Sequence, residues 1–337
     1  MSIDAYCEQT GSTSDVCTDD DLEFITCGNQ NTELLDRFLE CLAQRITPQV
    51  ATFAEHLAGA VNGAQAILFY GSNLRTGSLD GILDFYILCE GERERGIWPR
   101  VSYHERKIGD TVLRAKVATM NLTTFRAAAG GELIDTTIWA RFVQPSALAW
   151  QRDDDSAVAT ARAVAAAAIT AARLAVALGP TQAMAGQYWR CLFRATYAAE
   201  FRMEQVGREE TILSANREHF SGLLPMALRA AGIEFEAISQ HIHPSLSTVD
   251  RARILRWWGL RRRMGKILNL VRLLKASTTF EGAARYAAWK IERHTGVAVA
   301  LSAWQERHPV LAAPGVLWRV WREQRRGDSK QVRSLAS

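Results

Sequence analysis

The sequence contains little that would build a metal-bound or disulfide-rich framework. Proline is scarce, with 8 residues among 337, and only 6 cysteines are present. No two of them form a Cys-x-x-Cys pair, which excludes zinc-ribbon and thioredoxin-like sites. We expect free thiols in a reducing compartment, and the cysteines concerned are Cys7, Cys17, Cys27, Cys41, Cys89 and Cys191.

Long apolar segments are also missing. Residues 156–179 come nearest to one, but Arg162 and Arg173 interrupt them and alanine, which is only weakly apolar, predominates. This pattern predicts a buried or half-buried helix rather than a membrane span. The first ten residues, MSIDAYCEQT, lack the basic and apolar regions of a secretory signal. We therefore expect a cytoplasmic protein that crosses no membrane.

The charge that is present is unevenly distributed. Hydrophobic residues make up 48% of the chain and charged residues 23%, as in ordinary globular proteins, and the net charge is +4. Residues 251–337 contain 19 Lys or Arg and 5 Asp or Glu, about +14, which leaves 21 basic and 31 acidic residues, about −10, before them. This asymmetry predicts that the C-terminal part meets an anionic partner, either a membrane surface or a nucleic acid.

Composition and hydrophobic periodicity divide the chain into four regions. The first is polar and acidic, the second mixes helical and strand patterns, the third is Ala-rich and helical, and the fourth is basic and Trp-rich. We expect an α+β protein with a mixed sheet, and the predicted regions are a flexible acidic tail over 1–30, the sheet domain over 31–150, a helical domain over 151–249 and a basic helical tail over 250–337.

Within the second region the pattern is specific enough to place elements. A helix is predicted over residues 32–46, and a second helix should begin near residue 135 and stop at Pro145. Short runs of apolar, β-branched and aromatic residues bounded by turn signals predict strands over 66–70, 82–89 and 111–121.

Two of these strands flank a polar segment that carries the clearest chemical signal. Residues 67–88 read ILFYGSNLRTGSLDGILDFYIL, so a buried-looking strand ends in Gly71 and Ser72 and the next strand carries Asp84. Glycine lets backbone N–H groups approach phosphate oxygens, and the Ser hydroxyl adds a donor. A carboxylate on the neighbouring strand can hold a divalent metal that bridges those phosphates. The pairing resembles the nucleotidyltransferase fold.

That fold usually has a second acid two residues after the first, and this chain has Tyr86 there. Any metal site therefore needs another ligand, and the nearest candidates are Asp80, Glu90 and Glu105. A plain Gly-Ser turn with an incidental acid in the next strand is the structural alternative.

Four segments in order resemble the mitochondrial-type phosphatidate cytidylyltransferases, the CDP-diacylglycerol synthases of the translocator assembly and maintenance family. The resemblance covers about residues 35–230. It is carried by YGSNLRTGS…ILDFYI, by RAKVATMNLTTF (114–125), by WARFVQPSAL (139–148) and by RATYAAEFRMEQVGREE (194–210).

The resemblance implies transfer of CMP from CTP to phosphatidic acid, with Mg²⁺ as cofactor. It implies that nucleotide phosphates contact Tyr70, Gly71 and Ser72 and that Asp84, with Asp80 as a weaker candidate, binds the metal. Further catalytic residues would neutralise phosphate charge or support the site from a helix, and they are Lys116, Arg141, Glu200 and Arg202. Surface positions on a strand or helix are the ordinary alternative for each of these four.

The sequence also departs from the family pattern. The segment between the Gly-Ser turn and Asp84 is short and contains no lysine, and Ala140 and Gln144 stand where Gly and Lys would be expected. Loss of a lysine at Gln144 removes one possible phosphate contact, so the identity of the acceptor is less certain than the CTP chemistry.

The basic tail interleaves Trp and Leu with Arg and Lys at helical spacing, which is typical of a helix lying on anionic lipid. Packing against the catalytic body is the alternative, and nucleic acid is the less favoured partner because no nucleic-acid module is recognisable. The His-x-His at His241 and His243 is predicted to be a loop. Membrane contact is predicted for Trp257, Trp258, Arg261, Arg262, Arg263 and Lys266.

Together these features favour a magnesium-dependent cytidylyltransferase for phosphatidic acid or a related lipid phosphate, peripheral on the inner face of the cell membrane. Two alternatives stay open at this point. One is a nucleotidyltransferase with a non-lipid acceptor, and the other is an inactive lipid-binding scaffold, which the tyrosine at position 86 would support.

Overall fold

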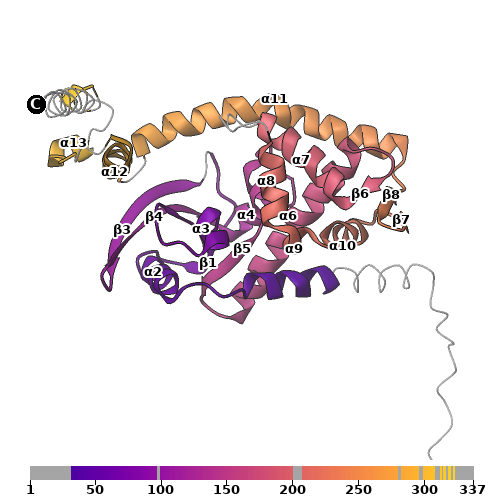
Figure 1. Cartoon of the computed structure of the whole chain (residues 1–337), viewed down its shortest axis with the longest axis horizontal. Helices are drawn as coiled ribbons and strands as arrows, with labels where there is room; N and C mark the ends of the chain where they lie inside the picture. Colours follow the sequence, from indigo (N-terminus) through magenta and orange to yellow (C-terminus); the bar gives the residue numbers. More distant parts are fainter. Residues whose placement is uncertain are drawn as a thin grey trace, which may run out of the picture.

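The computed structural model describes residues 32–96, 99–199, 207–279, 282–295 and 299–307, together with residues 312, 314, 315, 318, 319 and 322. Over these residues the chain is α+β, with a five-stranded mixed sheet surrounded by helices (Figure 1). The predicted acidic tail over 1–30 lies outside the described residues.

The five strands are ordered β3-β4-β2-β1-β5, and only the central pair β2 and β4 is parallel. The three strands predicted from the sequence are confirmed, whereas β3 and β5 were not predicted. Their bounds are β1 Ala64–Tyr70, β2 Leu83–Cys89, β3 Arg100–Ile108, β4 Thr111–Asn121 and β5 Ser146–Gln151.

One face of the sheet is covered by α2 (Pro48–Gly59), a helix that the sequence reading did not identify. Pro48 stands at its first position, where a missing N–H loses no helical bond. The helix buries Phe53 against Phe85 of β2, with ring centroids 6.0 Å apart. This smaller core covers the face of the sheet opposite to the one that carries Asp84.

The opposite face packs against helices from both predicted domains. The helix over 32–42, α4 (Leu122–Ala129), α5 (Thr137–Phe142) and α6 (Asp154–Leu178) share one continuous core with β1, β2 and β4. That core extends to Trp258, so the boundary predicted near residue 150 does not separate two hydrophobic cores.

The helix α6 is the centre of this core. Asp153 caps it by accepting a hydrogen bond from the Ser156 backbone N–H at 2.7 Å, and Gly179 follows its last turn. The helix is long and apolar enough to span a membrane by length and composition, but 72% of its apolar window is buried inside the protein. Its small alanine side chains let neighbouring helices pack close to it, as expected for a helix at the centre of a protein core.

Shorter elements follow α6. They include a small three-stranded sheet in the order β6-β8-β7, in which His241 and His243 lie on strand β8. The prediction of a loop at these histidines was therefore wrong, because Ile242 between them is buried and fixes the strand. The bounds are β6 Ala183–Met184, α7 Ala185–Ala199, α8 Arg208–Ala215, α9 Arg217–Phe220, α10 Leu223–Ala230, β7 Phe235–Ile238 and β8 His241–Pro244.

The basic region begins with the long helix α11 (Thr248–Thr279), followed by α12 (Ala283–Thr295) and α13 (Ala303–Arg307). Figure 1 shows α11 running along one side of the molecule and α12 lying beside the edge strand β3. The ring of Tyr286 on α12 packs edge-to-face against the ring of Tyr103 on β3, with 5.6 Å between the ring centroids.

Three of the residues predicted to contact a membrane instead hold α11 against the body. Trp258 is 3% exposed and packs on Trp139, and Arg261 is 6% exposed and donates hydrogen bonds to the carbonyls of Gly131 and Leu133. The indole N–H of Trp257 donates to the same Gly131 carbonyl at 3.1 Å. The prediction of membrane contact was wrong for the buried Trp258 and Arg261. Trp257 is half-buried, and the other three positions are exposed, namely Arg262, Arg263 and Lys266.

Candidate functional site

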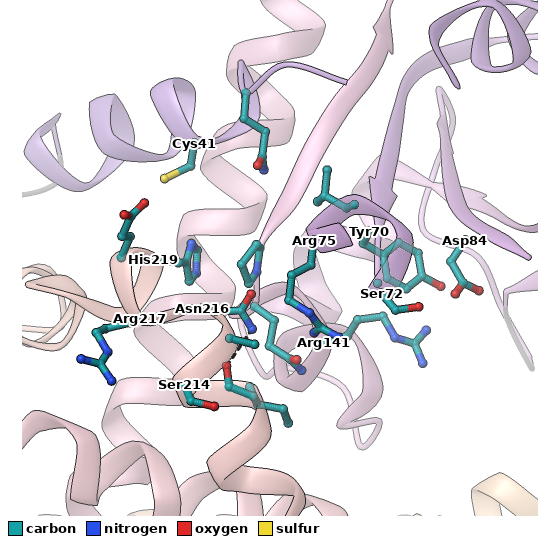
Figure 2. A pocket seen from close by; sticks show the side chains of 18 of the residues that line it. Cys41, Tyr70, Ser72, Arg75, Asp84, Arg141, Ser214, Asn216, Arg217 and His219 are labelled. Atoms are coloured by element: carbon teal, nitrogen blue, oxygen red, sulfur yellow. Dashed lines mark hydrogen bonds between the residues drawn. The ribbon is translucent and has the colours of Figure 1, made fainter. Parts of the chain in front are cut away.

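A cavity of about 950 Å³ lies where the larger core gives way to polar residues at the ends of the central strands. Tyr70 ends β1, Asp84 lies near the start of β2, and Lys116 is in the middle of β4. The opposite wall is formed by α8 and α9 and by the helix over 32–42. Figure 2 shows Ser72, Asp84 and Arg141 on one side and Cys41, Arg217 and His219 on the other.

The Gly-Ser turn is fitted closely to the acid that follows it. Gly71 has φ +91°, and a Cβ placed there would meet Asp84 Oδ2 at 3.2 Å. Both the backbone conformation and the lack of space therefore require glycine. The Gly-Ser pair between the two buried strands therefore brings the backbone beside the Asp84 carboxylate.

The single-turn helix α3 (Ser72–Thr76) that follows is held by its own side chains. Asn73, 8% exposed, donates from Nδ2 to the carbonyls of Ser78 and Asp80, both at 2.8 Å. The Thr76 hydroxyl donates to the Ser72 carbonyl at 3.0 Å. These bonds fix α3 relative to β2, so Ser72 and Arg75 enter the cavity from a rigid support.

Asp84 lies among cations. It is paired in register with Lys116 on the parallel strand β4 and with Tyr70 on the antiparallel strand β1. Burial raises the pKa of the Asp84 carboxyl, while the charges of Lys116 and Arg141 act in the opposite direction. A carboxylate in this position is costly unless a cation is close, and the two basic residues supply that compensation.

Tyr86 lies two residues after Asp84 on β2. Its side chain is 1% exposed and packs against Phe142, with ring centroids 5.2 Å apart. The guanidinium of Arg141 lies over the rings of Tyr70 at 5.3 Å and Tyr86 at 6.0 Å. Position 86 is therefore part of the aromatic support beneath Arg141, and its side chain is unavailable as a metal ligand.

The far wall of the cavity is built around His219. Burial lowers the pKa of His219 to about 4, an effect that the hydrogen bond to the Val143 carbonyl partly opposes and the Arg37 charge reinforces. The ring is therefore neutral at physiological pH. Arg37 fixes this segment by donating to the carbonyls of His219 and Ser221 at 2.7 and 2.8 Å.

The charged side chains that line the cavity are mostly cationic. Two are carboxylic acids, Asp84 and Glu218, and five are basic, namely Arg37, Arg75, Lys116, Arg141 and Arg217. Such a concentration of positive charge in a concave site attracts polyanions such as nucleotide phosphates.

The structure brings together six of the residues predicted for the site, which are Tyr70, Gly71, Ser72, Asp84, Lys116 and Arg141. Asp80 does not line the cavity, and its backbone carbonyl instead accepts a bond from Asn73. Glu200 and Arg202 lie outside the described residues, although Tyr197 of the same segment lines the cavity.

Several lining residues were not predicted. Arg75 lies three residues after Ser72, so helical spacing from the Gly-Ser turn could have indicated it. Most of the others come from α8, α9 and the residue between them, or from the helix over 32–42 and the residues just after it. No local signal marked them, because only the tertiary fold brings them to the cavity. They include Arg37, Cys41, Gln44, Ser214, Asn216, Arg217, Glu218 and His219.

The side chains of the site could bind magnesium only together with a bound nucleotide. Among the described residues, no group of three or more His, Cys, Asp or Glu side chains is placed to bind a metal ion. A nucleotide-bound magnesium needs only one or two protein carboxylates, because phosphates and waters supply the other ligands. Asp84 beside the Gly-Ser turn fits that role.

Comparison with protein-family models found no matching family, and comparison with curated proteins found no match. The fold and the site define the chain as an α+β protein with a cationic cavity, in which a Gly-Ser turn, a half-buried aspartate, a lysine and an arginine come together where β1 ends and β2 begins, beside the middle of β4.

Proposed function

We propose that the chain is a nucleotidyltransferase that transfers CMP from CTP to the phosphate of a lipid, phosphatidic acid or a close relative, and releases pyrophosphate. The observation that carries the proposal is the Gly71 backbone lying against the Asp84 carboxylate, with Lys116 opposite that acid, inside the cationic cavity. The nucleotidyltransferase-like identity of the sheet belongs to the same proposal.

The reaction is an in-line displacement. An oxygen of the acceptor phosphate forms a bond to the α-phosphorus of CTP, and the bond from that phosphorus to the bridging oxygen of the β-phosphate breaks. A phosphate monoester is already ionised at neutral pH, so no strong base is required and positioning with charge neutralisation provides the catalysis.

Each residue of the site has a role in this scheme. The backbone at Gly71 and the hydroxyl of Ser72 hold nucleotide phosphates, while Lys116 and Arg141 neutralise charge on the phosphoryl groups. Asp84 keeps both cations in place and would hold Mg²⁺, which when bound supplies further charge neutralisation at the phosphates. The neutral ring of His219 limits positive charge at the far wall.

Pyrophosphate release tests the proposal. The purified full chain is incubated with CTP, Mg²⁺ and phosphatidic acid in mixed micelles, and Asp84→Asn is compared with Asp80→Asn. We expect release that requires the lipid, a loss of about 100-fold or more in Asp84→Asn and little change in Asp80→Asn, because Asp80 does not line the cavity. Equal effects of the two substitutions, or no release at all, would reject it.

One observation favours a second candidate, an inactive lipid-binding scaffold of the same fold. The buried Tyr86 stands where the nucleotidyltransferase pattern would have a second acid, and Asp84, the carboxylate beside the Gly-Ser turn, lies near two cations. Such a protein would bind lipid phosphate but show no magnesium-dependent binding of CTP. A nucleotidyltransferase with a non-lipid acceptor would bind CTP and show no response to lipid.

A further inference from the structure

Helix α12 lies on the face of the sheet that carries Lys116. On β4, the residues at positions 113, 115 and 117 are buried in the core beneath α2, so Arg114 and Lys116, which alternate with them, lie on the opposite face. The Arg114 guanidinium is 5.6 Å from the centroid of the Trp289 ring of α12. Because Arg114 and Lys116 are neighbours on this face, α12 covers the strand directly beside the cavity.

The strand register places Asp84, Lys116 and Tyr103 in one row across the sheet. Lys116 is paired with Asp84 on β2 and with the buried Tyr103 on β3. The Tyr103 hydroxyl donates a hydrogen bond to Glu105 Oε1 at 2.6 Å, and Glu105 forms an ion pair with Arg114 at 3.3 Å. The cluster on which α12 packs therefore also holds the residue next to Lys116.

The start of α12 is fixed closely to that residue. Gly282, just before the helix, has φ +77°, and a Cβ there would lie 2.9 Å from the Tyr103 carbonyl oxygen. Both the conformation and the short distance require glycine. One turn into the helix, Tyr286 packs against the Tyr103 ring. The helix therefore has a defined position relative to β3.

The last turn of α12 reaches the loop that leads into Asp84. In this loop Gly81 has φ +91°, and a Cβ there would lie 3.1 Å from Arg293 Nη1. The Arg293 guanidinium also lies over the Trp289 ring, 5.3 Å from its centroid. On the side of α3, Asn73 holds the same loop by donating to two of its carbonyls at 2.8 Å. The loop is thus confined between α3 and α12.

We propose that Arg293 and Trp289 are positioning residues, which fix the loop before Asp84 and the strand beside Lys116 so that the acid and the lysine keep the separation that the reaction needs. Neither Arg293 nor Trp289 is among the residues that line the cavity, so both act through others. Small displacements of groups that align phosphates are costly in rate. The catalytic consequence rests on the proposed function, whereas the hold of α12 on the loop does not.

Kinetics of the full chain test the proposal. Pyrophosphate release is measured with CTP, Mg²⁺ and phosphatidic acid in mixed micelles for Arg293→Gln and for Trp289→Leu. The matched control is Arg285→Gln, because Arg285 is exposed and lies about two turns earlier on the same helix. Misalignment weakens the transition state more than the bound nucleotide. We therefore expect kcat to fall about tenfold in both test variants while the KM for CTP changes less than about twofold, and Arg285→Gln to keep the wild-type constants.

A purely structural role for α12 gives a different result. It would lower the thermal unfolding temperature without changing either kinetic constant below that temperature. Asn73 and Arg293 act on the same loop, so Asn73→Ala combined with Arg293→Gln should lose less activity than the product of the two single losses. Strictly multiplicative losses, unchanged kinetic constants, or an equal effect of Arg285→Gln would overturn the proposal.

Hydrogen exchange of the loop distinguishes this inference from the proposed function. The amides of residues 77–83 are followed in the nucleotide-free chain, and they should exchange at least about fivefold faster in Arg293→Gln than in the wild type or in Arg285→Gln. Unchanged exchange would overturn the positioning role even where pyrophosphate release is intact. Failure of the wild type to release pyrophosphate would reject the proposed function, and the exchange would still decide whether α12 fixes the loop.

Discussion

Asp84 and Lys116 lie opposite each other on the parallel strands β2 and β4. The acid is half-buried at the floor of a cavity whose other charges are mostly positive. This pair defines the electrostatics of the site: one carboxylate orders the cations around it, and the remaining positive charge is directed at a ligand.

Substituting Gly71 by alanine should reduce activity far more than stability. The positive φ costs about 1–2 kcal/mol for any L-residue, and the new Cβ would also press on Asp84 Oδ2. Gly109→Ala is the matched control, because its φ is +60° but no atom lies within 4 Å of the added Cβ. Thermal unfolding should shift downward in both variants, and more in Gly71→Ala because of the added contact with Asp84, but only Gly71→Ala should lose most of the pyrophosphate release.

Arg75 should contribute to nucleotide binding. It enters the cavity one helical turn from Ser72 on the support held by Asn73, so a triphosphate at the Gly-Ser turn lies within its reach. We expect Arg75→Ala to raise the KM for CTP about tenfold with a smaller effect on kcat. Arg106→Ala, an exposed arginine on β3, should leave both constants unchanged; an equal effect there would contradict the assignment.

His219 should make the fold sensitive to acid. Its pKa is lowered from 6.5 to about 4 in the folded chain, so the unfolded chain binds the proton more readily. The stability that the neutral ring provides is complete above about pH 6.5 and is lost as the pH falls toward 4, by at most about 3 kcal/mol.

Urea unfolding at pH 7.5 and pH 5 measures this loss. The decrease between the two values should be smaller in His219→Gln than in the wild type. The exposed His56 provides the control, since His56→Gln should keep the wild-type decrease. An unchanged pH dependence in His219→Gln would show that the imidazole is not held neutral by the fold.

Arg261 should be a structural residue. Removing its side chain leaves the Leu133 carbonyl without this donor and the buried Gly131 carbonyl with the Trp257 indole N–H as its donor, which should cost about 2 kcal/mol of unfolding free energy. The neighbouring Arg262 is exposed, and Arg262→Ala should change stability by less than about 0.5 kcal/mol. Denaturant unfolding distinguishes the two, and equal stabilities would contradict the role assigned to the Arg261 contacts.

The parts of the site that sequence alone could locate are those encoded locally. The Gly-Ser turn and Asp84 are separated by a dozen residues on adjoining strands, and their apolar flanks mark both strands. Lys116 and Arg141 were named through the family resemblance of their segments, not through hydrophobic periodicity. In contrast, His219 and Arg37 reach the cavity only through tertiary packing of α9 against the helix over 32–42.

The orientation of α11 could not be predicted for a different reason. Both sides of this helix carry apolar and basic residues, so periodicity alone does not show which side is buried. The buried side of α11 is determined by the segment that follows α4, where the carbonyls of Gly131 and Leu133 accept hydrogen bonds from Arg261. The strand β3 was missed because its partly exposed, charged sequence RVSYHERKI lacks an apolar run.

The most direct test of the central claim follows the α-phosphorus itself. CTP labelled at the α-phosphate is incubated with the full chain, Mg²⁺ and phosphatidic acid, and the lipid extract is compared with the aqueous phase. CMP transfer predicts that the α label enters the lipid as a CDP-linked product, while label at the γ-phosphate leaves as pyrophosphate. Recovery of the α label only as unreacted CTP or as free CMP would contradict the account.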